Sequence, residues 1–196
     1  MSAQNTRKRI IEAADRLFYE RGFEATSFAE IAASVNLSRG NFYYHFKTKD
    51  EILEAVLVKR DQSTRDMLAA WDGASDTPVE RILAFVRMLI VNQAKIMAFG
   101  CPVGGLSNEL AKLNHPAKAE ASGLFLIFRD WLAGQFVALG RAQDAQALAL
   151  HLLMRSQGVA TLATAFGDEA FVRREVADMT AWLAAQVPTT GQAPGS

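Results

Sequence analysis

The chain contains 196 residues, which is the length of one compact domain or of a small domain joined to a larger one. Its single cysteine excludes an intramolecular disulfide framework and a cysteine-rich zinc module, so the reducing cytoplasm is the expected location. Lys and Arg together number 21, and so do Asp and Glu, which gives a formal net charge of zero. Taken as an average, this balance offers no reason to expect a polyanionic partner.

The composition predicts an all-α protein. Hydrophobic residues make up 50% of the chain, alanine is abundant, and the β-branched residues are scattered rather than gathered in alternating runs. No run of 18 uncharged apolar residues occurs, because Arg87 interrupts the most apolar segment, residues 82–91. The sequence also lacks the motifs of phosphate-binding loops and metal sites. We therefore expect no membrane partner, no metal and no cofactor.

The first two expected helices have clear ends. The first covers residues 6–21, with Thr6 as its N-cap and Gly22 as its end. The second follows Ser27, which forms a capping box with Glu30, and ends near Asn36.

The next two helices complete a small unit. A third helix follows Ser38 and is expected to turn Phe42 and Phe46 inward. Thr48 and Glu51 form a second capping box, which opens a fourth helix to about residue 70. Because a three-residue turn, 36–38, joins the second and third helices, the segment has the arrangement of a helix-turn-helix.

Beyond this unit the expected helices are longer and carry fewer charges. They cover residues 78–99, a short segment to about 113, 117–139, 144–166 and 168–187, which makes about nine helices in all. Residues 188–196 are rich in Pro, Gly and Thr, and we expect them to be disordered.

The third helix carries side chains that can read DNA bases. Ser38 places a hydroxyl donor at the helix N-terminus, where a phosphate is well received. Gly40 removes a side chain from the surface, so the helix can approach a groove closely. Arg39 and Asn41 have the forked donors and acceptors that match guanine and adenine edges.

Donors for phosphate oxygens lie close to these residues. Tyr43 and His45 supply two of them, and Lys49 adds a charge-assisted contact. Residues 1–60 hold 10 Lys/Arg and 8 Asp/Glu, a net charge of +2, whereas residues 61–196 hold 11 and 13, a net charge of −2. The neutral total therefore hides a weakly basic head, and we expect DNA binding to depend on shape, paired geometry and a few placed contacts.

One continuous pattern contains all these residues. It comprises Thr26-Ser27, Ile31-Ala32, Ser38-Arg39-Gly40-Asn41-Phe42-Tyr43-Tyr44-His45-Phe46 and Lys49-Asp50-Glu51-Ile52. Over about residues 6–60 it resembles the N-terminal signature of the TetR family of transcriptional regulators. The resemblance implies an all-helical homodimer that binds a palindromic operator in double-stranded DNA, a C-terminal inducer pocket, and usually repression that a small-molecule effector releases.

The resemblance also implies roles and domain limits. By matching positions, Ser27 joins Tyr43, His45 and Lys49 as a phosphate contact, and Tyr44 stands where the family often has a polar or basic residue. The full set expected at DNA is Ser27, Ser38, Arg39, Gly40, Asn41, Tyr43, Tyr44, His45 and Lys49. The DNA-binding domain is expected at residues 1–48, with its motif at about 27–46, and the effector-binding and dimerisation domain at 49–187.

The last two expected helices carry apolar stripes on more than one face. Burying two faces of a helix suggests a partner, and the resemblance implies a four-helix bundle between two subunits. Along the helix 144–166, one stripe comprises Leu148, Leu152, Val159, Leu162 and Phe166, and a small-residue stripe comprises Ala145, Ala149, Ser156, Ala160 and Ala163. In the last helix the stripe comprises Val172, Val176, Met179 and Leu183. The alternative is that all of these stripes face the core of one subunit.

The inducer pocket is expected between the fifth and seventh helices. Aromatic and aliphatic side chains there suit an apolar or aromatic ligand, although such residues also serve as plain core. The candidate lining comprises Phe85, Leu89, Ile96, Met97, Cys101, Phe125, Phe128 and Trp131.

Cys101 allows three interpretations. Its segment, residues 100–105, resembles a Gly-Cys-x-x-Gly-Asn segment in a branch of the family that includes sensors of electrophiles and oxidants, but Gly105 stands where that branch often has Asn. A thiol at a helix N-terminus is more reactive, whereas a buried free cysteine often only packs. A thiol enzyme using Cys101 with His115 is the third interpretation, and the absence of hydrolase motifs argues against it. We expect a regulator that is not an enzyme; a DNA-binding protein without an inducer is the further alternative.

Overall fold

The computed structural model describes residues 3–188, and every regular element within that range is an α-helix. The all-α fold is therefore confirmed. Ten helices are found among these residues against about nine expected, because the segment predicted as one helix over 78–99 forms two. The tail predicted to be disordered lies, apart from Pro188, outside the described residues.

The chain divides into two compact units, each built from two separate stretches of sequence. Unit 1 comprises residues up to Arg65 together with Cys101–Phe125, and unit 2 comprises Asp66–Gly100 together with residues from Leu126 onward. Helices α4 (Lys49–Ala74) and α8 (Lys118–Ala138) contribute residues to both units. The expected division at residue 48 concerns function rather than compactness, and it stays a prediction.

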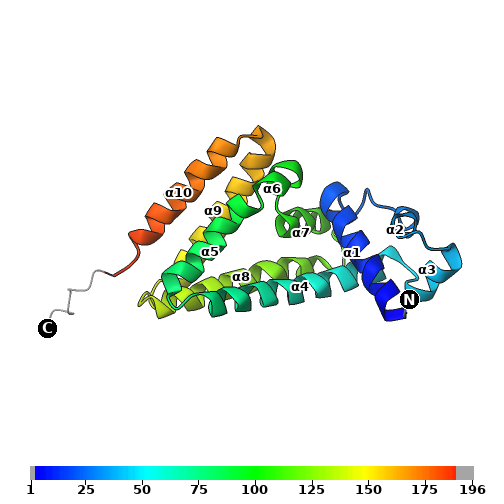
Figure 1. The fold of residues 1–196 in the computed structure, drawn as a ribbon, viewed down its shortest axis with the longest axis horizontal. Helices are drawn as coiled ribbons and strands as arrows, with labels where there is room; N and C mark the ends of the chain where they lie inside the picture. The colour runs from blue at the N-terminus through cyan, green and yellow to red at the C-terminus, as the bar shows by residue number, and fades with distance from the viewer. Residues whose placement is uncertain (1–2, 189–196) are drawn as a thin grey trace. The chain divides into compact units, whose positions relative to one another are not determined.

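Unit 1 contains the predicted helix-turn-helix. Its helices are α1 (Ala3–Arg21), α2 (Phe28–Ser34), α3 (Arg39–His45), the first part of α4, α7 (Pro102–Lys112) and the start of α8 (Figure 1). Helix α1 packs against both α2 and α7. The inner face of α1 is buried, with Ile10, Ala14 and Phe18 each almost inaccessible to solvent. Helix α1 therefore contributes one side of the core of unit 1.

The local signals for helix starts are mostly correct. Ser27 and Glu30 form the expected capping box, with the Glu30 amide 3.1 Å from the Ser27 hydroxyl and the Ser27 amide 2.7 Å from the Glu30 carboxylate. At the start of α4 the Glu51 amide donates to Thr48, but the Glu51 carboxylate accepts from Lys47 instead of closing the box. The expected N-cap Thr6 is wrong, because α1 already begins at Ala3 and the Thr6 side chain is buried.

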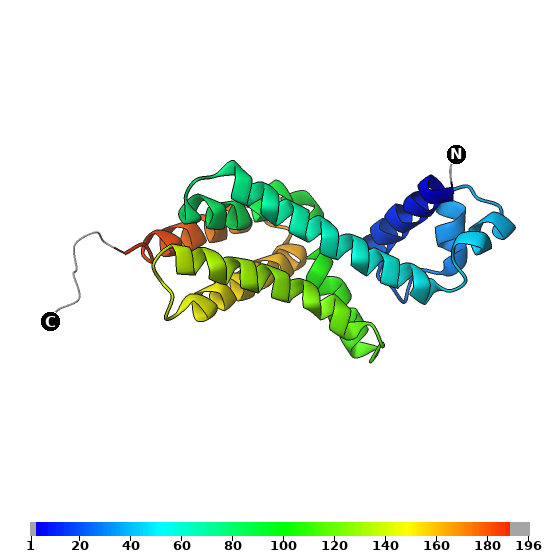
Figure 2. The same ribbon diagram turned by 90° about the horizontal axis from the view of Figure 1, so that it is seen from below.

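Unit 2 contains α5 (Pro78–Val91), α6 (Gln93–Phe99), α9 (Ala145–Phe166), α10 (Glu169–Ala184) and the adjoining parts of α4 and α8. Helices α9 and α10 form an antiparallel hairpin, and α5 lies beside both (Figures 1 and 2). The break between α5 and α6 falls at Asn92, whose side-chain amide donates to the Met88 carbonyl at 3.0 Å. Such a bond competes with the helical backbone pattern, which accounts for the extra helix.

The apolar stripes of α9 and α10 divide differently from the prediction. The α10 stripe is buried as expected, and so is the small-residue stripe of α9, which packs inside the chain together with Leu152 and Val159. The large apolar side chains that α9 leaves exposed are Leu150, Met154, Leu162 and Phe166. The small-residue stripe is therefore core, whereas Leu162 and Phe166 of the predicted large stripe stay exposed together with Leu150 and Met154.

Within residues 3–188, no single helix combines the length and the apolar composition needed to cross a bilayer, although α5 together with residues 93–112 reaches both as a bent pair.

Candidate nucleic-acid interface

A tight turn fixes α3 relative to α2. Asn36 has a positive φ of 53°, a conformation that Asn tolerates better than most residues. Its neighbour Val35 is buried, and the Val35 carbonyl accepts a hydrogen bond from Arg9 of α1 at 3.0 Å. The turn is thereby tied to α1.

Two phenylalanines set the rotation of α3 about its axis. Phe42 is fully buried and meets Phe28 of α2 edge to face, with ring centroids 4.8 Å apart. Phe46, which ends the helix, is 2% exposed and lies under the guanidinium of Arg7. Both were expected to point inward, and their burial turns the opposite side of α3 to solvent.

Seven of the nine residues expected at DNA are exposed. The exposed residues are Ser27, Ser38, Arg39, Gly40, Asn41, Tyr43 and Tyr44. Tyr44 is the most open of the aromatic residues here, at 72% exposure, and the Arg39 guanidinium lies over the Tyr43 ring. Six consecutive or nearly consecutive positions thus form one solvent-facing surface, residues 38–44 without Phe42.

Gly40 has no packing partner that would explain the lack of a side chain. A Cβ atom built at this position meets no other atom within 4 Å. The chain itself therefore leaves room for alanine at this position.

The two serines keep a free donor. Ser27 accepts the Glu30 amide and Ser38 accepts the Asn41 amide, at 3.1 and 3.4 Å. A hydroxyl oxygen that accepts one hydrogen bond can still donate its own hydrogen. Both N-caps can therefore contact an outside oxygen without weakening their helices.

His45 and Lys49 are half-buried, and both have partners within unit 1. The Lys49 ammonium donates to the Phe23 carbonyl at 3.0 Å and lies 4.1 Å from the centre of the Phe23 ring. The His45 ring meets Tyr44 edge to face at 5.1 Å. An ammonium group has three donors, so Lys49 retains hydrogens for an anion.

A carboxylate far along the sequence holds the loop before α2. Glu109 of α7 accepts the backbone amides of Phe23 and Glu24, each at 2.9 Å. Gly22, in a left-handed conformation, comes so close that an added Cβ would be 3.0 Å from the same carboxylate. Glu109 was not among the sequence candidates, because no local pattern connects it with residues so distant in the chain.

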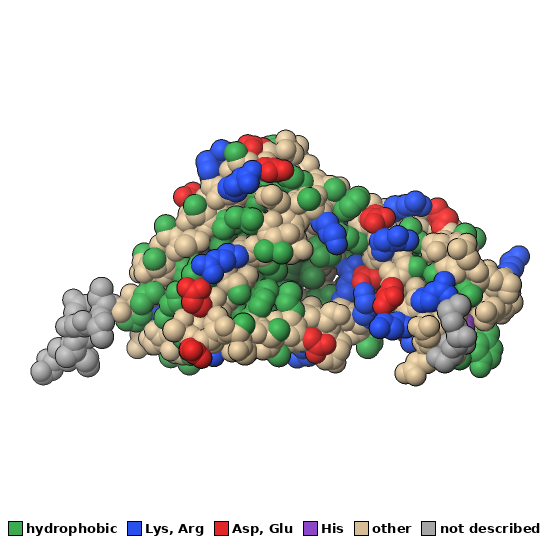
Figure 3. Space-filling model, viewed as in Figure 1, with side chains coloured by type: hydrophobic (Ala, Val, Ile, Leu, Met, Phe, Trp, Pro, Cys, Tyr) green, Lys and Arg blue, Asp and Glu red, His purple; other side chains and the backbone are tan. Residues whose placement is uncertain are grey.

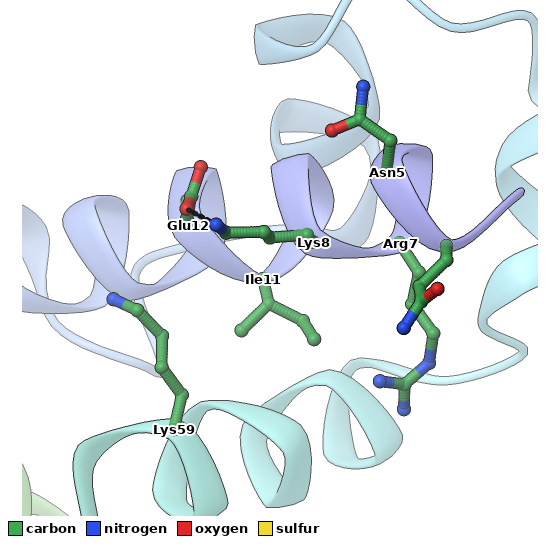
Figure 4. A pocket seen from close by; sticks show the side chains of 7 residues that line it. Asn5, Arg7, Lys8, Ile11, Glu12 and Lys59 are labelled. Carbon is green, nitrogen blue, oxygen red and sulfur yellow. Dashed lines mark ion pairs between the residues drawn. The ribbon is translucent and has the colours of Figure 1, made fainter. Parts of the chain in front are cut away.

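Two further cations lie near α3. Arg7 covers Phe46, and Lys47 donates to the Tyr43 carbonyl. Arg7 also lines a groove of about 450 Å³ between α1 and α4 (Figure 4). There Ile11 points from α1 toward α4, and Lys59 extends from α4 toward α1. Lys8 pairs with Glu12 and Lys59 pairs with Asp15, so these two positive charges are largely balanced.

The N-terminal part of the chain, which contains the helix-turn-helix, matches a known protein family. The family model described as bacterial regulatory proteins, tetR family, matches residues 10–56, which contain the turn, α2 and α3. This match places the N-terminal part of the chain in the TetR family.

Two relatives named as transcriptional regulators match different lengths of the chain. The chain is 43% identical over 74 residues to the HTH-type transcriptional regulator TtgR of Pseudomonas putida, a match that spans 38% of this chain and 35% of that regulator. It is 27% identical over 133 residues to the HTH-type transcriptional repressor DhaR of a Mycobacterium species, spanning 67% of this chain and 64% of DhaR. The chain thus matches about a third of the length of TtgR. These relatives are regulators rather than enzymes, as expected.

The fold of the whole chain is also that of known members. The crystal structure of SCO4454, a TetR-family regulator from Streptomyces coelicolor, superimposes with a TM-score of 0.81 at 23% identity, covering 94% of this chain and 97% of that one. This likeness confirms the expected TetR-like fold beyond the segment that the family model matches.

The residues expected in a TetR-family inducer pocket are divided between the units. Cys101 and Phe125 belong to unit 1, and the other six belong to unit 2. In unit 2, Phe85 and Phe128 are buried with ring centroids 5.9 Å apart, and Trp131 is 5.6 Å from Trp71. Leu89 and Ile96 are buried and Met97 is half-buried. The pocket itself stays a prediction.

Cys101 is the N-cap of α7. Its sulfur accepts the Gly104 amide at 3.4 Å. The carbonyl of the next residue, Pro102, accepts a hydrogen bond from the Arg60 guanidinium at 2.6 Å. Burial raises the pKa of the nearby Tyr19 to about 12; Cys101 adds to the rise and Arg60 opposes it. The thiol is half-buried beside a helix N-terminus and a cation.

Proposed function

We propose that this TetR-family chain is a DNA-binding transcriptional repressor that binds a palindromic operator as a homodimer. The single observation that carries this proposal is the orientation of α3, whose buried Phe42 turns five polar or aromatic residues and Gly40 to solvent. Family membership adds the class of partner, because the matched relatives are named transcriptional regulators and DhaR a repressor.

The exposed positions divide into two roles. Arg39 and Asn41 read base edges in the major groove, and Gly40 allows the close approach that this reading requires. Ser27, Ser38, Tyr43, Tyr44, His45 and Lys49 are assigned to the backbone, where donors fix register without reading sequence.

The homodimer is assigned to the last two helices. Leu150, Met154, Leu162 and Phe166 are each more than 40% exposed on α9. Exposed large apolar side chains that follow one another along a helix favour a protein partner. Two reading heads must also be held about 34–36 Å apart to meet successive half-sites, which a dimer achieves.

Release is assigned to a small apolar or electrophilic effector bound by the C-terminal domain. The aromatic side chains of unit 2, Phe85, Phe128 and Trp131, support an apolar pocket. Because the proposed partner is DNA, the proposed site of action is the cytoplasm.

Selection from a random duplex pool tests the DNA-binding proposal and identifies the operator sequence at the same time. The purified protein should enrich a palindrome with half-sites about one helical turn apart. Enrichment of no sequence at any salt concentration would overturn it.

Two variants then test the assigned roles. On the selected duplex, Lys49→Ala should weaken binding equally for specific and random DNA and lower the salt dependence by about one unit of slope. Arg39→Ala should cost about 1–3 kcal/mol and also relax base preference. Equal losses on both duplexes for Arg39→Ala would remove that residue from the base-reading set.

A second candidate concerns how the DNA is released. Cys101 accepts the Gly104 amide, which makes its sulfur the N-cap of α7, and it lies next to the Arg60–Pro102 contact. An electrophile or oxidant that modifies this sulfur would remove the N-cap of α7. If N-ethylmaleimide releases DNA from the wild-type protein and not from Cys101→Ser, the cysteine is the sensor; equal release from both proteins excludes it.

A further inference from the structure

Three buried side-chain atoms within residues 3–188 lack a hydrogen-bond partner, and all three belong to unit 2. They are Gln93 Oε1, Gln135 Oε1 and His151 Nε2. Gln135 is the most enclosed glutamine in the core of the chain, with 8% of its surface exposed. A buried acceptor that receives no donor loses its hydration without compensation, so each such atom calls for an explanation.

The orientation of the Gln135 amide is fixed by its neighbour. The side-chain nitrogen donates to the Asp72 carboxylate at 3.1 Å. Exchanging the amide oxygen and nitrogen would place an acceptor against that carboxylate, which is repulsive. The amide oxygen is therefore held on the other side, as an acceptor without a donor.

The aromatic residues Phe128 and Trp131 precede Gln135 on α8. Trp131, one turn before Gln135 on α8, donates its indole N–H to the same Asp72 carboxylate, with both oxygens at 3.1 Å. Phe128 precedes Trp131 on the same face of α8 and meets Phe85 of α5. Figure 3 shows hydrophobic side chains gathered over the visible face of unit 2, with few charges among them.

The Asp72 carboxylate makes the surroundings of Gln135 negative. Asp72 accepts from Trp131 and Gln135, and its ion pair with Arg81 is long, at 3.9 Å. Arg81 donates instead to the Ser75 carbonyl at 2.9 Å. A ligand bound here would therefore meet an amide acceptor close to a carboxylate, which disfavours an anion.

We propose that Gln135 anchors an aromatic ligand that carries an N–H or O–H donor, such as a phenol or an aromatic amine, and that excludes carboxylates. The donor hydrogen-bonds to Gln135 Oε1, and the ring packs on Phe128 and Trp131. This inference rests on the proposed function, in which unit 2 binds the effector, and it names the chemical class of that effector.

Matched probes test the class directly by calorimetric titration of the full chain without DNA. 2-Naphthol and 2-methoxynaphthalene differ by the donor, and 2-naphthoate adds a negative charge. We expect 2-naphthol to bind at least about tenfold more tightly than either of the others, because a site built around a hydrogen bond rejects an analogue that lacks the donor. Equal affinities for 2-naphthol and 2-methoxynaphthalene, or no heat with any probe, overturn the inference and leave Gln135 to an internal water.

A substitution locates the preference. Gln135→Met keeps the length of the side chain and removes the acceptor, so 2-naphthol should lose its advantage while 2-methoxynaphthalene binds as before. Gln146→Met makes the same change at an exposed position of α9 and should change neither affinity. A preference that persists in Gln135→Met overturns the assignment; if that variant does not fold, the wild-type probe comparison still decides the class.

The selected duplex separates this inference from the proposed function. If 2-naphthol binds with the expected preference and also releases the duplex, both hold. If it binds with that preference and the duplex stays bound, the ligand site stands and the proposed release by this class of effector fails.

Discussion

The two compact units of this chain differ in how completely their buried polar atoms are hydrogen-bonded. In unit 1, the orphan amides of the loop before α2 are accepted by Glu109, and Arg60 is shared between Asp15 and the Pro102 carbonyl. In unit 2, three buried polar atoms among the described residues have no partner. Unit 2 also carries most of the exposed large apolar side chains.

The difference suggests two kinds of task. A fully paired polar network favours one geometry, because any rearrangement leaves donors or acceptors unsatisfied. That property suits a head that must present α3 to DNA at a fixed angle. Unpaired buried acceptors and exposed apolar surface, in contrast, gain free energy when something else binds. Unit 2 is therefore suited to partners, in the form of a second subunit and a small ligand.

The largest effect is expected from a substitution among the exposed apolar residues of α9, the proposed dimer interface. Met154→Lys places a charge in the exposed stripe of α9, where burial against a second subunit would be costly. We expect a monomer by analytical ultracentrifugation and a loss of about 100-fold in affinity for a palindromic duplex, because the second head no longer binds intramolecularly.

Val91→Lys is the matched control for that substitution. Val91 is 80% exposed on α5, so the same charge should leave the subunit assembled. A dimer in both variants would show that the exposed stripe of α9 is not the interface.

The next effect tests the pairing in unit 1. Glu109→Ala removes the acceptor of the Phe23 and Glu24 amides, and we expect the free energy of unfolding to fall by about 2 kcal/mol, measured by urea denaturation. Glu109→Gln keeps one acceptor and should lose less. Glu120→Ala, an exposed glutamate of α8 in the same unit, should change little; equal effects of Glu109→Ala and Glu120→Ala would contradict the role of the clamp.

A smaller effect separates stability from DNA binding at α3. Gly40→Ala should raise the free energy of unfolding by about 0.5 kcal/mol, because alanine is the better helix former and no atom obstructs its Cβ. The same variant should bind the selected duplex more weakly. Gly73→Ala in α4 also has open space and should leave DNA binding unchanged; unaltered binding by Gly40→Ala would show that close approach is not required there.

The sequence predicts those features that depend on near neighbours. The caps at Ser27 and Ser38 and the burial of Phe42 and Phe46 follow from spacings of three or four residues, which an isolated helix already satisfies. Periodicity also identifies the apolar faces of α9. It cannot tell which face a neighbouring helix covers, so it leaves open which stripe meets a partner, and the structure buries the small-residue stripe inside the chain.

Long-range contacts explain what the sequence missed. Glu109 accepts hydrogen bonds from Phe23 and Glu24, which lie 86 and 85 positions earlier in the chain. Asp72 accepts from Trp131 and Gln135, which lie 59 and 63 positions later. No local pattern encodes such pairs, because their geometry depends on how whole helices pack. The break at Asn92 was missed for a related reason, since an Asn within an apolar run is compatible with either one helix or two.

The smallest expected effect is a pH dependence that sharpens the description of unit 1. Burial raises the pKa of Tyr19 to about 12 from 10. Between about pH 10 and pH 12 the folded chain keeps the phenol proton and the unfolded chain has lost it. The contribution of protonated Tyr19 to the free energy of unfolding is therefore complete below about pH 10 and is lost as the pH rises to about 12. Tyr19→Phe has no such proton, and the difference in free energy of unfolding between wild type and variant should shrink across this window in urea titrations. A difference that stays constant with pH would mean that water reaches the phenol, and that the contact of α1 with the start of α7 is more open than the rest of the paired head.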